Sequence, residues 1–135
     1  MRVTISSALM EEMFDHAASA APHEACGIML AADPANAEHI TGLLPSPNVH
    51  PAPDTHFEID PQILVDVLRQ ERAGGARVAG YYHSHPVGRA RPSATDGALS
   101  PRDGRLWAII GEGTAAFWRD GEDGFQKVSY LIDDR

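Results

Sequence analysis

Residues 77–96 read RVAGYYHSHPVGRARPSATD, a stretch that predicts a strand ending in a group of polar side chains. If the strand continues to His85, then His83 and His85 are two positions apart and project from the same face, because side chains alternate along a strand. Pro86 ends the strand, and the glycine-containing loop after it can turn the chain back. We therefore expect Asp96 to approach the two imidazoles.

Two helices are predicted before this stretch. Apolar residues recur at helical spacing after Ser7 until Pro22 stops the pattern. Asp60 followed by Pro61 is typical of a helix start, and the apolar face that follows ends at two glycines. Four prolines between residues 45 and 53 predict a loop there.

Short apolar runs indicate strands on both sides of the HSHP sequence. They cover residues 3–5, 25–30 and 40–44 before it, and 106–110, 114–118 and 125–130 after it. The last connections are too short for parallel crossovers, so we expect a central mixed sheet. Flanking helices then make the fold class α/β or α+β, in a single domain over residues 1–135.

Composition argues against several classes of protein. The 135 residues include 11 Lys and Arg against 19 Asp and Glu, a formal charge of −8, which disfavours a protein that grips nucleic-acid phosphates. No apolar run approaches the ~20 residues that span a bilayer, and Glu11 and Glu12 interrupt the candidate signal segment. The single cysteine, Cys26, suits a reducing compartment. We expect a soluble cytoplasmic protein that binds neither nucleic acid nor membranes.

Two histidines and an aspartate in this arrangement indicate a metal centre. A single histidine at a strand end is more often solvated than metal-bound, so the inference depends on the whole set. Two imidazoles and one carboxylate leave the fourth tetrahedral position to water, which is typical of a catalytic rather than a structural zinc ion. We expect His83, His85 and Asp96 to bind one Zn²⁺ per chain.

Ser93 and two arginines lie between these expected ligands in the sequence. Ser93 can be a helix N-cap, the hydroxyl donor that stabilises an oxyanion, or both, because the two roles use different valences of one hydroxyl. Arg89 and Arg91 are expected at the mouth of the site, where they are either solvated or paired with a substrate tail or carboxylate. Both arginines are candidate substrate-binding residues.

Two further groups have two interpretations each. Cys26 is interpreted as a small buried residue rather than a nucleophile, because no base with an orienting partner is visible around it. His50, Asp54 and His56 lie on the proline-rich loop, where solvated side chains are the preferred interpretation and a second metal site is the alternative. The loop is also a candidate for substrate contact.

The sequence HSHP followed by ARPSATD resembles the signature of the JAMM, or MPN-plus, zinc metalloproteases. That signature is His-x-His-Pro, followed by a Pro-Ser-x-x-Asp segment. Those enzymes also carry a glutamate far upstream, near the start of a strand after the first helix. Residues 22–27, PHEACG, look like that element, so Glu24 is the matching position.

The resemblance implies a fold and a chemistry. The fold would be the cytidine-deaminase-like JAB1/MPN fold. His83, His85 and Asp96 would bind Zn²⁺, Glu24 would be the general base and then the general acid, and Ser93 would assist the oxyanion. Family members cut peptide or isopeptide bonds after the Gly-Gly tail of ubiquitin-like proteins, and short prokaryotic members act on small sulfur-carrier or ubiquitin-like proteins.

Competing functions differ in the residues that they need. The same fold also serves as a non-catalytic scaffold or interaction module in relatives that have lost metal ligands, whereas this sequence keeps the whole set. A zinc nucleoside deaminase needs His-x-Glu and Pro-Cys-x-x-Cys, which one cysteine cannot supply. A serine hydrolase needs an elbow such as Gly-x-Ser-x-Gly, which is absent. We therefore expect a metallopeptidase whose partner is a ubiquitin-like or sulfur-carrier protein with a Gly-Gly tail.

Overall fold

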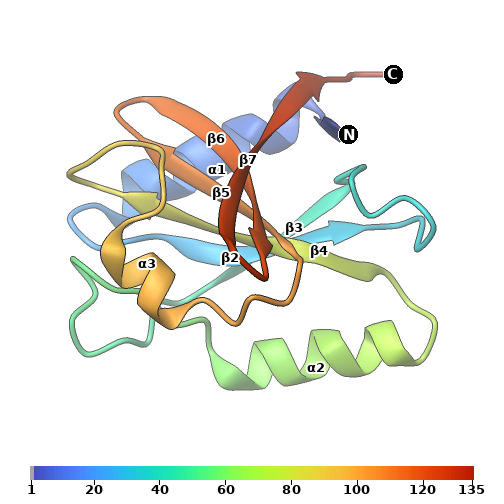
Figure 1. Ribbon diagram of the computed structural model, residues 1–135, viewed down its shortest axis with the longest axis horizontal. Coiled ribbons are helices and arrows are strands. Elements are labelled where there is room, and N and C mark those ends of the chain that lie inside the picture. Colours follow the sequence, from blue (N-terminus) through green and yellow to red (C-terminus); the bar gives the residue numbers. More distant parts are fainter. Residues whose placement is uncertain (1) are drawn as a thin grey trace.

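Within residues 2–135, which the computed structural model describes, a seven-stranded mixed sheet is flanked by helices (Figure 1). Along the chain the elements are β1 (Arg2–Ile5), α1 (Ser7–Ala20), β2 (Cys26–Ala31), β3 (Gly42–Ser46), α2 (Pro61–Arg72), β4 (Arg77–His85), α3 (Ala94–Leu99), β5 (Leu106–Gly111), β6 (Thr114–Gly121) and β7 (Gly124–Ile132). Side by side, the strands follow the order β1-β7-β6-β5-β4-β2-β3. The pairs β1–β7 and β4–β5 are parallel and the others are antiparallel. The predicted mixed sheet with flanking helices is thus confirmed.

The alternation of side chains along the strands divides the core into two layers. On one face, Met10 and Met13 of α1 are buried in a cluster with Met29 of β2. On the other face, Val67 of α2 packs with Ile28, the neighbour of Met29 in β2. Each fully buried apolar side chain of this size contributes ~1.5–3 kcal/mol. In Figure 1, α1 accordingly lies behind the sheet, while α2 runs along the bottom of the view.

The second helix begins and ends where the sequence predicts. Asp60 caps α2 by accepting a hydrogen bond of 2.9 Å from the N–H of Gln62, and Pro61 is the first helical residue. The helix ends at Arg72, shortly before Gly74, whose φ of 93° lies in the left-handed region that favours glycine. None of the helices in residues 2–135 is long and apolar enough to span a lipid bilayer.

The third strand differs from its prediction. β3 covers Gly42–Ser46, whereas the sequence indicated a strand over 40–44 and a loop from residue 45. The strand continues through Pro45 because β3 lies at the edge of the sheet. Proline has no backbone N–H to donate, but the outer side of an edge strand has no neighbouring strand that would accept such a hydrogen bond. On its inner side Pro45 pairs with Gly27 of β2. The proline-rich loop therefore begins at residue 47 and leads to α2.

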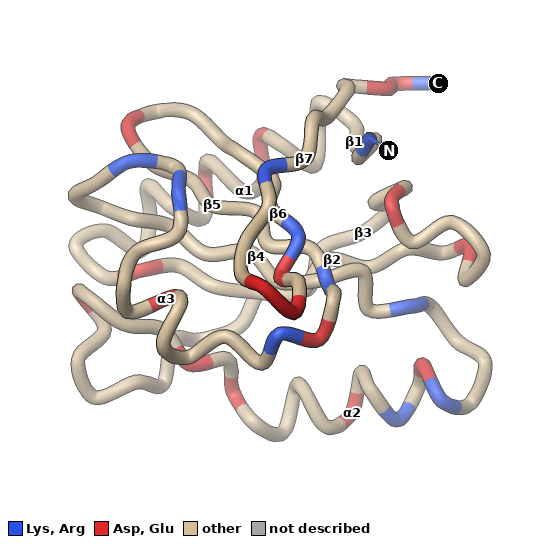
Figure 2. The backbone as a smooth tube through the Cα atoms, viewed as in Figure 1, with Lys and Arg blue, Asp and Glu red and all other residues tan. Residues whose placement is uncertain are grey.

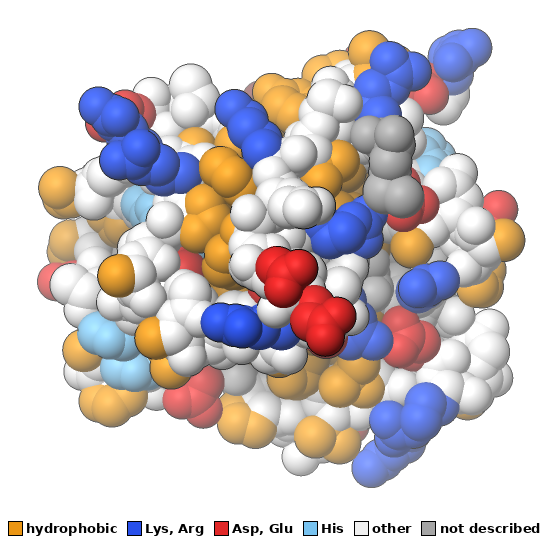
Figure 3. All heavy atoms as spheres, in the orientation of Figure 1, with side chains coloured by type: hydrophobic (Ala, Val, Ile, Leu, Met, Phe, Trp, Pro, Cys, Tyr) orange, Lys and Arg blue, Asp and Glu red, His pale blue; other side chains and the backbone are white. Residues whose placement is uncertain are grey.

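Charged residues are concentrated outside the central strands. β2 and β5 contain no charged residue, whereas charges are frequent on helices, loops and turns (Figure 2). On the face shown in Figure 3, basic side chains gather over the loop between β4 and α3 at the upper left, and again at the C-terminal end of α2 at the lower right. The first of these basic regions adjoins the candidate site.

Candidate metal centre

Three of the predicted site residues meet where β4 ends and α3 begins. The Nε2 atoms of His83 and His85 lie 3.1 Å apart. The Oδ2 atom of Asp96 lies 3.2 Å from Nε2 of His83 and 3.1 Å from Nε2 of His85. His83 is fully buried and Asp96 is 4% exposed, so the three polar atoms meet at a point with little access to solvent. The fold therefore brings together the two imidazoles and the distant carboxylate.

Asp96 is held in place by the first turn of α3. The N–H of Ser93 donates to Oδ2 of Asp96 over 2.9 Å, and the N–H of Asp96 donates to Oγ of Ser93 over 3.0 Å. This reciprocal pair is a capping box, which fixes the carboxylate relative to the helix. Ser93 is thus the N-cap of α3, and its own O–H remains a donor that the cap does not use.

Different interactions orient the two imidazoles. Nδ1 of His85 lies 2.8 Å from the backbone oxygen of Arg89, which can only accept, so Nδ1 carries the proton and Nε2 of the neutral ring has the free lone pair. Nδ1 of His83 is buried without a hydrogen-bond partner among residues 2–135. Its ring is instead stacked on Phe57, with centroids 4.4 Å apart, and meets Trp107 edge-on at 5.4 Å. Aromatic packing therefore restrains the buried imidazole.

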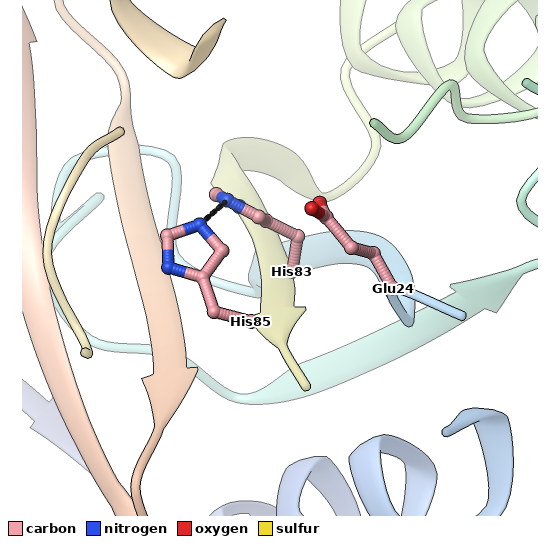
Figure 4. Close-up of side chains that lie close together, drawn as sticks. All are labelled: Glu24, His83 and His85. Atoms are coloured by element: carbon pink, nitrogen blue, oxygen red, sulfur yellow. Dashed lines mark hydrogen bonds between the residues drawn. The ribbon is translucent and has the colours of Figure 1, made fainter. Parts of the chain in front are cut away.

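Glu24 lies just before β2, and its carboxylate points toward the histidines (Figure 4). The residue is 6% exposed, and its Oε1 atom has no hydrogen-bond partner among residues 2–135. One ligand-type atom from each of Glu24, His83 and His85 lies within 4.8 Å of the other two. Burial raises the pKa of Glu24 to about 7. The charge of Asp96 also raises this pKa, whereas the charge of His85 lowers it. Glu24 is therefore a buried carboxyl group beside the point where the other three side chains meet.

Backbone hydrogen bonds fix the segment that carries Glu24. Its N–H donates to the oxygen of Pro53 over 2.7 Å, and Nδ2 of Asn48 donates to the oxygen of Glu24 over 3.0 Å. The N–H of Ala25 donates to Oγ of Ser84 over 2.8 Å, and the N–H of Ser84 donates back to the oxygen of Ala25 over 3.0 Å. Ser84 lies between the two histidines, so one short piece of β4 carries the imidazoles and also positions the glutamate.

Two residues of the site, Asn48 and Ser84, were not predicted from the sequence. The one sequence signal for Ser84 is its place within HSHP, between the two histidines.

The geometry and ionisation of these residues fit a divalent cation. Ligands at roughly 2.0–2.1 Å from a tetrahedral zinc ion are about 3.3 Å from one another, close to the 3.1 and 3.2 Å that separate the three polar atoms. Burial lowers the pKa of His83, which favours the neutral imidazole. Burial alone would raise the pKa of Asp96, but hydrogen bonds with His83 and His85 hold it well below its usual range. A neutral imidazole and an ionised carboxylate are the forms that bind metal ions. Burial alone would lower the pKa of His85, but hydrogen bonds with Asp96 and with the backbone of Arg89 raise it, so a bound cation would displace the proton of that ring.

Two cavities adjoin the cluster through different residues. The first, of about 470 Å³, reaches the cluster at Asp96 and is named the apolar groove. Its walls include the apolar side chains Phe57, Ile59, Leu64, Leu68, Leu99 and Trp107. The second, of about 850 Å³, is named the arginine cavity because Arg89 and Arg91 line it together with Glu24 and His85. Ser93 also lines the arginine cavity.

The polar residues of the proline-rich loop do not form a second metal cluster. The rings of His50 and His56 stack with centroids 4.5 Å apart, whereas Asp54 is hydrogen-bonded to His23 over 2.5 Å. Within residues 2–135, the side chains close enough together to hold an ion are Glu24, His83 and His85, with Asp96 in contact with both histidines, and no residue of the proline-rich loop belongs to this group. The side chains of this loop remain partly or largely exposed, and they also take part in stacking and a hydrogen bond.

Cys26 is a core residue with no exposed surface. Its Sγ lies 3.9 Å from the backbone oxygen of Ser46 and 3.7 Å from that of Pro47. Burial raises the pKa of the thiol to about 12. Because the thiolate is the nucleophilic form of cysteine, a thiol in this state is inert at neutral pH. The interpretation of Cys26 as a small buried residue is therefore confirmed.

Known proteins match the chain along most of its length. A family model described as prokaryotic homologs of the JAB domain matches residues 6–121. The desampylase of Haloferax volcanii is 30% identical over 139 residues, which cover 98% of this chain and 97% of that protein. The probable TtuB-protein conjugate cleaving protease of Thermus thermophilus is 36% identical over 88 residues, which cover 65% of this chain and 56% of that protein.

Solved structures share the fold. A protein of Desulfitobacterium hafniense has a TM-score of 0.83 and 28% identity, covering 98% of this chain and 94% of that one. A JAB1/MPN domain protein of Archaeoglobus fulgidus has a TM-score of 0.63 and 19% identity, covering 96% of this chain and 98% of that one. A structure described as JAMM, a metalloprotease-like zinc site in the proteasome and signalosome, has a TM-score of 0.59 and 18% identity, covering 97% of this chain and 99% of that one. The last two structures show the JAB1/MPN fold. The family match over residues 6–121 and the 30% identical relative show that the chain belongs to the prokaryotic homologues of the JAB domain, a short JAMM/MPN family.

Proposed function

We propose that this chain is a zinc-dependent metallopeptidase that hydrolyses the peptide or isopeptide bond after the C-terminal Gly-Gly of a ubiquitin-like or sulfur-carrier protein. Relatives named as a desampylase and a probable conjugate cleaving protease support a hydrolase of this kind. The observation that carries the proposal is the meeting of His83, His85 and Asp96 beside the buried carboxyl group of Glu24. A reduced, buried Cys26 suits a cytoplasmic setting.

In this proposal His83, His85 and Asp96 hold one zinc ion per chain. When bound, the ion supplies Lewis acidity, which activates water near neutral pH and polarises a carbonyl group. The protein prepares this site in advance, because the capping box fixes Asp96 and the backbone oxygen of Arg89 fixes the ring of His85.

Glu24 is proposed as the general base and then the general acid. Its Oε1 atom is buried, has no hydrogen-bond partner among residues 2–135 and lies near the histidines, so it is free to accept a proton from the attacking water. The same carboxyl group then delivers that proton to the nitrogen of the leaving amine. The bonds from Asn48 and from the Ala25–Ser84 pair hold the segment in place for both transfers.

Ser93 is proposed to stabilise the oxyanion of the tetrahedral intermediate. Its Oγ accepts the N–H of Asp96 in the capping box, and this leaves the O–H free to donate into the arginine cavity that Ser93 lines. A donor aimed at the developing negative charge contributes more in the transition state than in the ground state.

The apolar groove is proposed to take the tail of the acyl partner. It reaches the cluster at Asp96, and its walls come from α2, the end of α3 and the proline-rich loop. An extended tail that ends in two glycines is thin enough to pass between such walls, and burial of the apolar residues before the glycines supplies binding energy that orients the scissile bond.

The test is to incubate the zinc-loaded protein with the small Gly-Gly-tailed proteins of its host, each extended at the C-terminus, and to follow cleavage by mass spectrometry. We expect cleavage directly after the second glycine, one bound zinc ion per chain, and loss of both in His83→Ala. The Glu24→Gln variant should retain zinc and lose hydrolysis. If the zinc-loaded protein cuts none of these substrates but binds them, the chain is a scaffold and the proposed activity is refuted.

A further inference from the structure

One wall of the apolar groove comes from a segment that is neither helix nor strand. This segment, residues 100–105, connects α3 to β5 and is named the α3–β5 loop. Pro101, Asp103 and Arg105 of the loop line the groove together with Leu99, the last residue of α3. The opposite wall belongs to α2 and the proline-rich loop, and in Figure 1 the chain after α3 runs just above α2. The position of the α3–β5 loop therefore sets the width of the groove.

A single buried carboxylate holds this loop. Asp120 of β6 has no exposed surface, and its Oδ1 atom accepts a hydrogen bond from the hydroxyl of Ser100. Its Oδ2 atom accepts the backbone N–H of Arg102 over 3.0 Å. The backbone oxygen of Asp120 accepts the N–H of Gly104 over 2.8 Å, and its N–H donates to the oxygen of Arg105 over 3.0 Å. Asp120 therefore holds the loop through four hydrogen bonds, two of which depend on its side chain.

The loop needs this hold because part of its backbone is in an unfavourable conformation. Arg102 has a φ of 51°, in the left-handed region that is costly for a residue with a side chain. Such a conformation persists only where surrounding contacts offset its cost, and the N–H bound by Oδ2 of Asp120 belongs to this same residue. Without that acceptor we expect Arg102 to relax toward negative φ and to move the adjacent Pro101. The wall of the groove therefore depends on Asp120.

Asp120 lies outside both cavities, so any effect that it has on a substrate is indirect. It lines neither the apolar groove nor the arginine cavity. Side chains alternate along β6, so Asp120 faces the same side of the sheet as Trp118 and the opposite side from Phe117, which packs in the cluster with α1. Trp107, the partner of Trp118 in β5, lines the groove. Asp120 is therefore buried on the groove side of the sheet, under the loop that it holds.

We propose that Asp120 is a positioning residue for the acyl partner, because it holds the α3–β5 loop and so keeps the apolar groove formed before the tail arrives. This inference rests on the proposed function, which assigns the groove to the tail. A preformed site avoids the cost of ordering a loop during binding. When only a fraction of the free molecules has the binding-competent loop, the apparent Kd equals the intrinsic Kd divided by that fraction. Loss of the hydrogen bonds to Asp120 therefore weakens binding and leaves the reaction of the bound substrate unchanged.

The first measurement separates binding from hydrolysis. All proteins carry Glu24→Gln and bound zinc, and they are titrated in a calorimeter with a small Gly-Gly-tailed protein of the host that is extended by one alanine. Asp120→Asn is nearly isosteric, but its amide oxygen accepts at one position only, and its NH₂ group faces the second donor. We expect the Kd to rise about 10-fold, in keeping with the loss of a hydrogen bond to a charged group. Ser100→Ala removes the donor to Oδ1 alone and should raise the Kd about 3-fold.

The second measurement is steady-state kinetics with Glu24 intact. Asp120→Asn should raise KM by a similar factor and keep kcat within about 2-fold, because the loop is ordered once the tail is bound. The control is Val3→Ala, since Val3 is fully buried in the cluster with α1 and lines neither cavity. This control should lose stability through the cavity that it creates, with no change in Kd or KM.

Hydrogen exchange shows where in the chain the effect arises. The backbone N–H groups of the α3–β5 loop should exchange faster in free Asp120→Asn than in the parent, and they should regain protection when the Gly-Gly-tailed protein binds. A Kd that stays at the control value in either loop variant, or unchanged protection of the loop in Asp120→Asn, overturns this inference alone. If the zinc-loaded Glu24→Gln protein binds none of the Gly-Gly-tailed proteins, the assignment of the groove to the tail is refuted, and the inference with it.

Discussion

Phe57 lies flat against the imidazole of His83, with ring centroids 4.4 Å apart and planes inclined by 19°. Phe57 belongs to the loop between β3 and α2, whereas His83 belongs to β4, so this contact joins the proline-rich loop to the candidate metal centre. Nδ1 of His83 has no hydrogen-bond partner among residues 2–135, so apart from the contacts of Nε2 with His85 and Asp96 the ring is oriented by its aromatic neighbours. The loop therefore forms part of the structure around the candidate site.

Replacing Phe57 by alanine should weaken zinc binding. Loss of the groups that orient a metal ligand lowers metal affinity ~10- to 100-fold, and we expect an effect in this range because the ring of His83 loses its stacking partner and is oriented less firmly. The zinc affinity can be measured by competition with a chromophoric chelator. Phe125→Ala is the control, because Phe125 packs on Trp107 at 4.9 Å and has no ring contact with His83. Equal zinc affinities of the two variants would contradict this view of the stacking.

Ser84→Ala should reduce turnover while zinc remains bound. The substitution removes the acceptor of the N–H of Ala25, so the segment that carries Glu24 keeps one of its two hydrogen bonds to Ser84 and is held less firmly on β4. A buried donor left without a partner costs about 1–3 kcal/mol of stability, and a misplaced catalytic group costs ~10²-fold in rate. The measurements are kcat with an extended Gly-Gly protein and the zinc content.

A second buried serine provides the control for Ser84. Oγ of Ser46 also accepts a backbone N–H, that of Asp60, over 2.9 Å, and Ser46 is 4% exposed. Ser46→Ala should therefore lose comparable stability without the loss of kcat. If both variants lose kcat to the same extent, the loss in Ser84→Ala comes from lower overall stability and not from a displaced Glu24.

Glu24→Gln should stabilise the metal-free protein at neutral and alkaline pH. Burial raises the pKa of Glu24 from 4.5 in its ordinary state to about 7 in the folded chain. The folded state thus binds the proton more tightly, and stability falls as pH rises from about 4.5 through 7 and the buried carboxyl group ionises. Glutamine is neutral throughout, so the variant should match the parent near pH 4.5 and exceed it by about 1–2 kcal/mol above pH 7, allowing for solvent screening.

This pH dependence can be read from denaturant unfolding of both proteins after zinc has been removed with a chelator. The exposed Glu122→Gln, on the turn between β6 and β7, is the control and should leave the free energy of unfolding unchanged at both pH values. A Glu24→Gln variant that is no more stable than the parent at pH 8 would show that the carboxylate is well solvated there.

Sequence and structure agree where the information is local. The alternation along β4 places His83 and His85 on one face, and the capping signal at Ser93 places Asp96 in the first turn of α3. Both features depend on neighbouring residues, so periodicity and capping chemistry predict them. The mixed sheet was predictable for the same reason, since the length of each connection limits the direction of the next strand.

The missing parts of the site depend on contacts between distant segments. Asn48 binds the backbone of Glu24 from 24 residues away, and Phe57 reaches His83 from another element. No periodicity or turn signal marks either residue, because their roles arise only when the proline-rich loop packs on β2 and β4. The end of β3 was misjudged for a related reason: whether a strand tolerates Pro45 depends on its place at the sheet edge, which is a property of the whole fold.

Ser93→Ala tests whether the hydroxyl acts in the reaction as well as in the capping box. We expect zinc to be retained and kcat to fall ~10²-fold, because a donor to the oxyanion is lost. Loss of the cap alone destabilises the helix by about 1 kcal/mol. Ser6→Ala provides the comparison, because Ser6 caps α1 by accepting the N–H of Leu9 over 3.2 Å and does not line either cavity. If Ser93→Ala loses only the stability that Ser6→Ala loses and keeps its kcat, then Ser93 is a cap and the oxyanion must be stabilised by other groups.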